Sequence, residues 1–226
     1  MHVDLDSWSR GDSWLHRRDA RAKLLATLFM LIAVGTSAVP LAHLAPVACA
    51  AAVSRLPPVS LAARAALVLP FTLSFAAVSI LGGDWNRAYL VIIRSMLSAA
   101  TVAILTGVTP LPSLVRGAER LGAPRLLMEV IQFLYRYLYV LYDQAARMRW
   151  ASQSRGGFRW EAAGGAIGVL FASSYQRAEA IHRAMLARGF DGRLQRSTLG
   201  RMGAADIAMA AGVAGTLSAA RLVWGF

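Results

Sequence analysis

Residues 88–108 read AYLVIIRSMLSAATVAILTGV, and the one charged side chain among them is Arg94. A helix that crosses the hydrocarbon core of a bilayer needs roughly 20 mostly apolar residues, which this stretch supplies. Four further apolar runs have the same character: residues 24–37, 41–56, 61–81 and 204–219. The sequence therefore predicts an all-α integral membrane protein with about five transmembrane helices.

The composition of the whole chain supports this fold class. Hydrophobic residues make up 57% of the chain and charged residues 16%, and the mean hydropathy is +0.48. A soluble domain carries about a quarter charged residues. Between Lys23 and Glu119 the only acidic residue is Asp84, so the missing charge is concentrated in the apolar half of the chain.

Proline and arginine interrupt two of the apolar runs. Pro70 lies inside run 61–81 and predicts a kink, because proline lacks a backbone N–H and clashes with the preceding turn. Residues 82–86, GGDWN, are predicted to form a loop. Arg94 lies about two turns from the outer end of its run, where a charge is costly. It either reaches the interface or faces a partner protein.

The positive charge indicates orientation rather than a nucleic-acid partner. The formal net charge is +12 and the pI is near 11.2, but the basic residues cluster beside the apolar runs, as in cytoplasmic loops of membrane proteins. Basic residues in 16–23 place the N-terminus in the cytoplasm. Segment 109–203 holds over half of all Lys and Arg, and counting the spans puts it on the same side.

Four parts of the chain follow from these patterns. We expect a cytoplasmic N-terminal segment over residues 1–22 and a four-span transmembrane region over 23–108. A cytoplasmic module of long helices follows over 109–203, and the last transmembrane helix takes 204–226.

No enzyme motif is present in the sequence. A phosphate-binding Gly-x-x-x-x-Gly-Lys-Ser/Thr loop, a His-Glu-x-x-His zinc motif and a Gly-x-Ser-x-Gly nucleophile motif are all missing. The four histidines are scattered along the chain: His2, His16, His43 and His182. His43 is predicted to be a polar turn residue, and Cys49, the only cysteine, a small buried hydrophobic residue. We predict no catalytic residue, no metal site and no cofactor bound by this chain.

Two long helices are predicted in the cytoplasmic module, over residues 125–155 and 162–188. The first ends in Ser154-Arg155-Gly156 and the second in Ala187-Arg188-Gly189. Each ending places a small residue, an arginine and a helix-ending glycine in a row. The planar guanidinium can hold a carboxylate through two hydrogen bonds. An arginine at a helix C-terminus can also simply complement the helix dipole, but two such endings on consecutive helices favour a docking role.

At these residues the sequence resembles the transmembrane T component of energy-coupling factor (ECF) transporters, a family marked by two Ala-Arg-Gly motifs on cytoplasmic coupling helices. The second ending matches the motif, and the first departs from it at Ser154. Residues 15–24, LHRRDARAKL, resemble the family's Leu-His-x-x-Asp-Pro-Arg-x-Lys-Leu, with Ala20 in place of proline. The layout looks most like the cobalt-type, or CbiQ-type, branch.

The resemblance implies a scaffold that transmits movement and performs no bond chemistry. Its expected partners are two ATP-binding cassette ATPase subunits, which hold ATP and Mg²⁺, a small membrane subunit that captures a metal ion (cobalt first) or a vitamin, and the lipid bilayer. The docking residues would be Ser154, Arg155, Gly156, Ala187, Arg188 and Gly189. The location would be the bacterial cytoplasmic (inner) membrane, crossed several times. A self-contained secondary transporter or channel is the main alternative.

Overall fold

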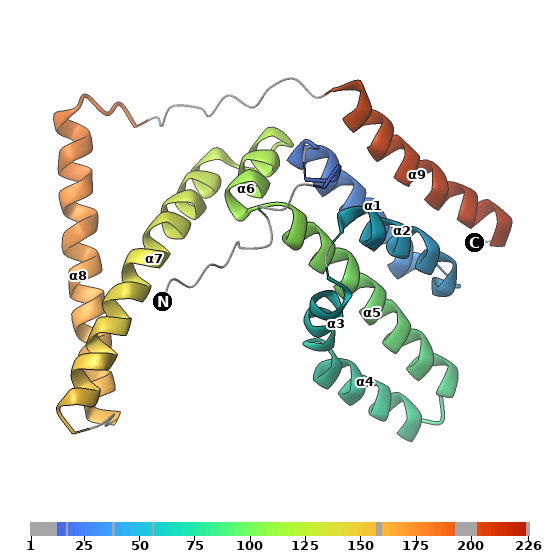
Figure 1. Cartoon of the computed structure of the whole chain (residues 1–226), viewed down its shortest axis with the longest axis horizontal. Coiled ribbons are helices and arrows are strands. Elements are labelled where there is room, and N and C mark those ends of the chain that lie inside the picture. The colour runs from blue at the N-terminus through green and yellow to red at the C-terminus, as the bar shows by residue number, and fades with distance from the viewer. Residues whose placement is uncertain are drawn as a thin grey trace. The chain divides into compact units, whose positions relative to one another are not determined.

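The computed structural model describes residues 13–16, 18–37, 39–55, 57–156, 160–192 and 203–224. Over these residues the chain is helical throughout, without a strand (Figure 1), as predicted. The elements are α1 (Ala20–Thr36), η2 (Pro40–His43), α2 (Leu44–Ser54), α3 (Pro58–Ala66), α4 (Leu69–Leu81), α5 (Trp85–Val108), α6 (Leu111–Arg120), α7 (Arg125–Ser154), α8 (Trp160–Ala187) and α9 (Ala204–Trp224).

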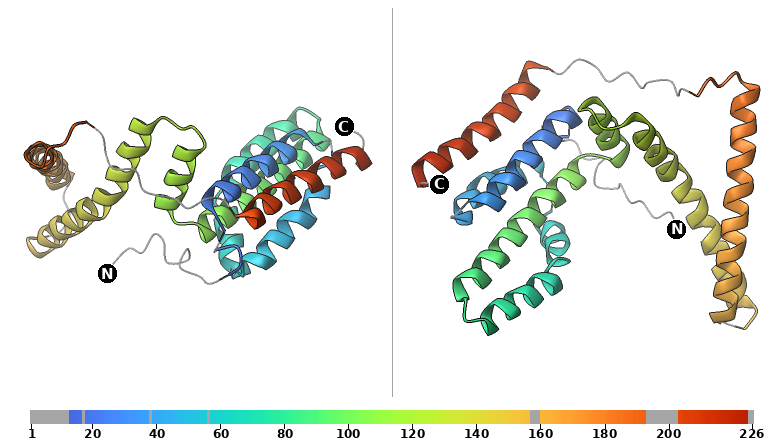
Figure 2. Two further views of the ribbon diagram at one scale, coloured as in Figure 1. Left: turned by 90° about the horizontal axis from the view of Figure 1, so that it is seen from above. Right: turned by 180° about the vertical axis from the view of Figure 1, so that it is seen from behind.

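The helices divide into two compact units, each of which is described by itself. The first comprises Met1–Gly122 with Leu199–Phe226 and contains α1 to α6 and α9. The second comprises Ala123–Thr198 and contains α7 and α8. In the first unit, α1 packs between α5 and α9, so the last helix of the chain lies against the first (Figures 1 and 2).

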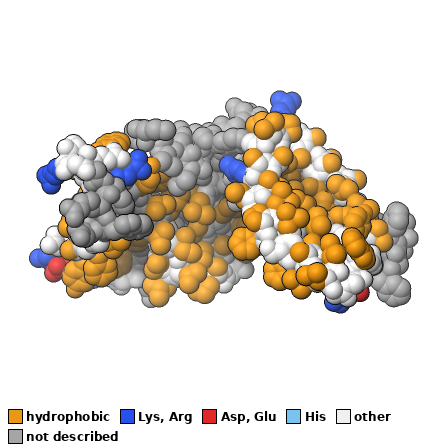
Figure 3. Space-filling model, turned by 90° about the horizontal axis from the view of Figure 1, so that it is seen from below, with side chains coloured by type: hydrophobic (Ala, Val, Ile, Leu, Met, Phe, Trp, Pro, Cys, Tyr) orange, Lys and Arg blue, Asp and Glu red, His pale blue; other side chains and the backbone are white. Residues whose placement is uncertain are grey.

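The core of the first unit forms where α1, α2 and α5 meet. Its buried side chains are all apolar: Met30, Ala33, Val34, Val47, Leu97, Ile104 and Val108. Outside this core, α4 packs on α5 and leaves large apolar side chains uncovered, with Phe71 72% and Leu81 88% exposed. On the face seen in a space-filling view, hydrophobic side chains gather over large parts of the described surface (Figure 3). Such a surface suits hydrocarbon rather than water.

Among the described residues of the first unit, one helix, or two if a bent pair counts as one span, is long and apolar enough to cross a bilayer. One is α5, with 24 residues; the other is α3 and α4 together, which are bent by 52° at their junction. The bend precedes Pro70, the second residue of α4, and confirms the predicted kink. Helix α1 has 17 residues. Two further apolar helices, residues 40–54 and 204–213, are shorter than α1 in the part of the chain that the structure describes. The predicted count of five spans therefore stays a prediction.

Three sequence-based expectations are wrong in detail. Cys49 is exposed, because Val47 is on the buried face of α2 and two residues rotate an α-helix by about 200°. His43 is not in an open turn but in η2, with 2% of its surface exposed. The loop at 82–86 is shorter than expected, because Gly83 adopts a left-handed φ of +83° and α5 begins at Trp85.

Arg94 has a hydrogen-bond partner within the chain, and the two roles that the sequence left open, reaching the interface or facing a partner protein, stay predictions. Its guanidinium donates a hydrogen bond of 2.7 Å to the backbone carbonyl of Ser37, the C-cap of α1. The last carbonyls of a helix have no partner within the helix. Arg94 of α5 therefore donates to a carbonyl that α1 itself leaves unpaired. This contact joins α5 to α1.

A close approach of backbones attaches α6 to the start of α1. Helix α6 is strongly amphipathic and buries Val115 and Gly117. A Cβ atom at Gly117 would lie 3.1 Å from Leu24 Cδ1 and 3.3 Å from Ala20 Cβ. The absence of a side chain at Gly117 therefore lets α6 rest on the first turns of α1.

Candidate functional site

The first motif, Ser154-Arg155-Gly156, forms the end of α7. The Ser154 hydroxyl donates to the carbonyl oxygens of Trp150 and Ala151, both at 3.1 Å, and so closes the last turn. The amide of Arg155 still donates to Ser152 O, but Gly156 adopts a φ of +111°, which turns the chain out of the helix. A side chain at this φ would be strained.

The second motif, Ala187-Arg188-Gly189, ends α8 in a Schellman arrangement. The amide of Gly189 donates to Leu186 O and the amide of Phe190 donates to Met185 O, each at 3.0 Å. These are the two bonds that define this helix ending, and they require a left-handed residue where Gly189 has a φ of +78°. Arg188 is thus the capping residue, at the point where the helix stops.

Both motif arginines are exposed. In the part of the chain that the structure describes, neither the Arg155 nor the Arg188 side chain forms a hydrogen bond or an ion pair. Arg183, one turn before the second motif, is by contrast paired with Glu179 at 3.3 Å. Each guanidinium therefore has N–H groups available to donate hydrogen bonds to a carboxylate of another molecule.

The two motifs lie at opposite ends of a helical hairpin. Helices α7 and α8 contact each other near the connection between them and run in opposite directions (Figure 1). Gln144 of α7 donates a hydrogen bond of 2.8 Å to the Ser173 hydroxyl of α8. Since α8 has 28 residues, its length separates the two arginines by roughly 40 Å. One small partner domain could not bind both.

The N-terminal motif forms a second cluster, which the sequence did not predict to involve α9. Asp19 is the N-cap of α1 and accepts a hydrogen bond from the Arg21 amide at 3.0 Å. Ala20 is then the first helical position, where proline is favoured. Asp206 of α9 accepts from the Asp19 amide at 3.4 Å and pairs with Arg18 at 3.6 Å.

Asp206 also organises the start of its own helix. Its carboxylate accepts a hydrogen bond of 3.1 Å from the amide of Gly203, three residues earlier, as in a capping box. The residue is 9% exposed. The only local signal that could have suggested its role is an acidic residue in the first turn of a helix; its partners are 187 residues away.

Comparison with known proteins places the chain in a family. A family model described as CbiQ, cobalt transport protein, matches residues 11–198. The chain belongs to this family. The match confirms the resemblance to the cobalt-type branch, and it makes the chain a member of a family of membrane transport components rather than of a known class of enzymes.

Three archaeal relatives match parts of the chain. An uncharacterized protein of Methanocaldococcus jannaschii is 32% identical over 83 residues, which cover 34% of this chain and 28% of the relative. A second uncharacterized protein of that archaeon is 25% identical over 107 residues, with 45% and 40% covered. A putative fused cobalt transport protein, CbiMQ, of Methanocorpusculum labreanum is 27% identical over 110 residues, with 46% and 18% covered. The chain thus spans less than half the length of each relative.

Proposed function

We propose that the chain is the transmembrane coupling subunit of an ATP-driven, ECF-type cobalt importer. Its second unit binds two ATP-binding cassette ATPase subunits in the cytoplasm, and its first unit is the membrane scaffold for a separate capture subunit. The observation that carries the proposal is the pair of exposed arginines, Arg155 and Arg188, unpaired among the described residues, at opposite ends of the α7–α8 hairpin.

Each motif has the features of a docking end. The left-handed glycine, Gly156 or Gly189, turns the chain away immediately after the arginine, so that no following helical turn covers the guanidinium. A carboxylate in an acidic groove of an ATPase subunit can then accept two parallel hydrogen bonds from the guanidinium. Hydrogen bonds to charged groups contribute about 1.5–3 kcal/mol each.

The separation of the motifs suits two partners that move relative to each other. With one ATPase at each end of the hairpin, closure of the ATPase pair would push on two points of the same rigid element. The Gln144–Ser173 hydrogen bond joins the two helices near their connection, so a displacement of one helix carries the other with it. Packed helices transmit such movements because their interiors compress little.

In this proposal cobalt is the substrate, and the separate membrane subunit captures it. The family description supports the cargo. The relative whose name describes a fused CbiMQ supports a physical association between a chain like this one and another cobalt transport component. The membrane in this proposal is the bacterial cytoplasmic (inner) membrane. The charge distribution supports an N-terminus and a second unit on its cytoplasmic side.

Charge reversal at the second motif tests the docking role. Arg188→Glu should weaken binding of the ATPase subunits by roughly 10–100-fold, because it removes a charge-assisted contact of about 1.5–3 kcal/mol and sets like charges against each other. ATP-dependent cobalt uptake should fall with it. The measurements are the amount of ATPase that copurifies with the tagged chain and uptake of radioactive cobalt by cells.

Arg120→Glu is the matched control. Arg120 is also an exposed arginine at a helix end, two residues before a left-handed glycine, Gly122, but it lies outside both motifs. It should retain ATPase binding and uptake. Equal losses in the two variants would show that general positive charge, and not the motif, holds the ATPases.

A further inference from the structure

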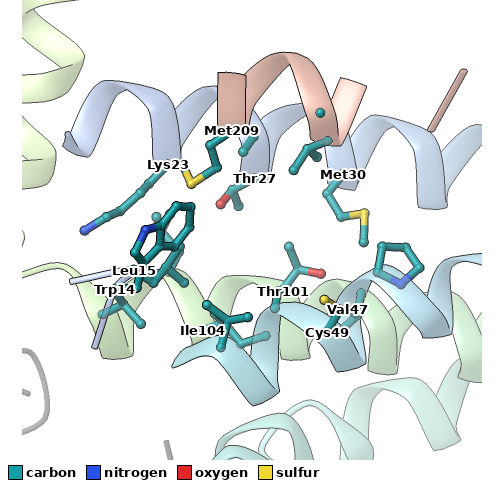
Figure 4. Close-up of a pocket in the computed structure, with 18 of the residues that line it drawn as sticks. Trp14, Leu15, Lys23, Thr27, Met30, Val47, Cys49, Thr101, Ile104 and Met209 are labelled. Carbon is teal, nitrogen blue, oxygen red and sulfur yellow. The ribbon is translucent and has the colours of Figure 1, made fainter. Parts of the chain in front are cut away.

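A cavity of about 620 Å³ lies in the first unit, and none of its described lining residues belongs to either motif. Its walls come from α1, α2, α5 and α9, and the residues Trp14 and Leu15 before α1 complete it (Figure 4). Fourteen of its twenty described lining residues are aliphatic or methionine. Thr27 and Thr101 add hydroxyls, and Lys23 is the one charged lining residue among those described. Its volume is within the range of about 300–1,000 Å³ usual for ligand sites.

The cavity is elongated along α1. Lys23 and Trp14 lie at one end, and Met30 and Val47 lie at the other (Figure 4). Seven residues of α-helix separate Lys23 from Met30, a rise of roughly 10 Å. One leaflet contributes about half of the roughly 30 Å hydrocarbon core, so with α1 perpendicular to the bilayer the cavity would extend over about two-thirds of the depth of a leaflet.

Small side chains on two walls leave the cavity open to the side. Ala45 and Cys49 of α2 are exposed cavity residues one turn apart, and Ala208 and Gly212 of α9 repeat that spacing. A Cβ atom at Gly212 would have no neighbour within 4 Å. The cavity is thus accessible from the hydrocarbon surface of the unit, at a slot lined by small residues.

The end at Lys23 is positively charged and amphipathic. The Lys23 ammonium donates to the carbonyl of His16 at 3.2 Å, which leaves two of its three N–H groups for other acceptors. The Arg18 guanidinium lies 4.1 Å from the centre of the Trp14 ring. Arg18 pairs with Asp206 and Arg21 pairs with Asp19, so both of these carboxylates already have an arginine partner. Tryptophan and lysine are the usual anchors at a membrane interface.

We propose that this cavity binds one acyl chain of an anionic phospholipid, with the lipid phosphate at the Lys23 end. The apolar walls would contact the chain by van der Waals packing, and the Lys23 ammonium, which has N–H groups left to donate, would select an anionic headgroup. The inference requires the first unit to lie in a bilayer but is independent of ATPase docking. A lipid held here would bridge α2 and α9, the two walls between which the slot opens.

Native mass spectrometry of the purified full-length chain tests the proposal. Dioleoyl phosphatidylglycerol added in detergent should yield a one-lipid complex that survives dissociation far better than the dioleoyl phosphatidylcholine complex. Gly212→Leu, which fills the slot, should abolish the complex. Gly35→Leu is the control, because Gly35 is equally exposed, has no neighbour within 4 Å of a built Cβ, and does not line the cavity.

The headgroup end has its own variant pair. Lys23→Met should remove the preference for phosphatidylglycerol and leave acyl-chain binding, whereas Arg87→Met on the exposed start of α5 should change neither. Equal survival of the lipid complex in the two glycine variants would overturn the site. An unchanged preference in Lys23→Met would overturn the assignment of the phosphate to this end.

Cys49 provides a second measurement without engineering, since it is the only cysteine and lines the cavity. Bound phosphatidylglycerol should slow its alkylation by N-ethylmaleimide severalfold in the wild type and not in Gly212→Leu. If deletion of residues 1–12 speeds alkylation as much as removal of lipid does, the chain's own N-terminal segment occupies the cavity and the proposal is wrong.

Discussion

At the scale of single residues, Arg94 shows how a charge is accommodated in an apolar helix. The cost of the charge is offset because the guanidinium meets the unpaired Ser37 carbonyl at the C-terminus of α1, 2.7 Å away. Two groups that would each be costly in hydrocarbon therefore satisfy one another.

Arg94→Met should lower the free energy of unfolding by about 1–3 kcal/mol, because the buried carbonyl of Ser37 is left without its partner. The measurement is denaturation of the purified chain in detergent, followed by circular dichroism. Arg87→Met, on the exposed start of the same helix, should leave the transition in place. If both variants unfold alike, the contact between Arg94 and Ser37 contributes nothing to stability.

At the scale of helices, Asp206 fixes where α9 meets α1. One carboxylate receives the amides of Gly203 and Asp19 and pairs with Arg18. The contact with Gly203 caps the start of α9, and the contact with Asp19 joins α9 to the N-cap of α1. The pair with Arg18 holds the segment before α1. The helix that is last in the chain is thereby positioned by the first few described residues.

Asp206→Ala should destabilise the first unit by about 1–3 kcal/mol, since it leaves two amides and one guanidinium without an acceptor. The midpoint of thermal unfolding in detergent should fall by several degrees. Asp84→Ala is the comparison. Asp84 is the N-cap of α5 and pairs with Arg87, but its side chain is 64% exposed. A matching fall in Asp84→Ala would contradict the role given to Asp206.

At the scale of the whole molecule, the separation of the two motifs carries a prediction about stoichiometry. Because roughly 40 Å of α8 lies between Arg155 and Arg188, each should hold a different ATPase subunit. Native mass spectrometry should find two ATPases with the wild type, one with Arg155→Glu or Arg188→Glu, and none with the double variant. Loss of both ATPases in either single variant would show instead that they bind only as a preassembled pair.

Much of the helical layout could be predicted because its signals are local. Helix α7 ends at Ser154 and α8 at Ala187, within a residue of the predicted positions, since glycine alone readily adopts the left-handed φ that ends a helix. Pro70 breaks its run wherever the helix packs, because the missing N–H is a property of the residue. The match to the family confirmed the resemblance that the arginine motifs and residues 15–24 suggested.

The error at Cys49 and the missed role of Asp206 came from contacts between distant parts of the chain. Cys49 was expected to be buried, but which face of α2 turns inward is decided by α5, on which α2 packs. Hydropathy alone could not show this, because α2 is apolar on all sides. Asp206 gave no sign of its role, since Asp19 and Arg18 come near it only after α9 has packed along α1.

The sequence by itself determined the all-helical class, the ends of the two long helices and the placement of an arginine at each. These properties depend on apolar length, glycine and proline, which act within one turn of the chain. Only the tertiary structure decided the partner of Arg94, the link between α1 and α9, and the cavity that ends at Lys23. Each of these requires side chains from helices far apart in sequence, and an apolar sequence does not specify which helix faces which until they pack.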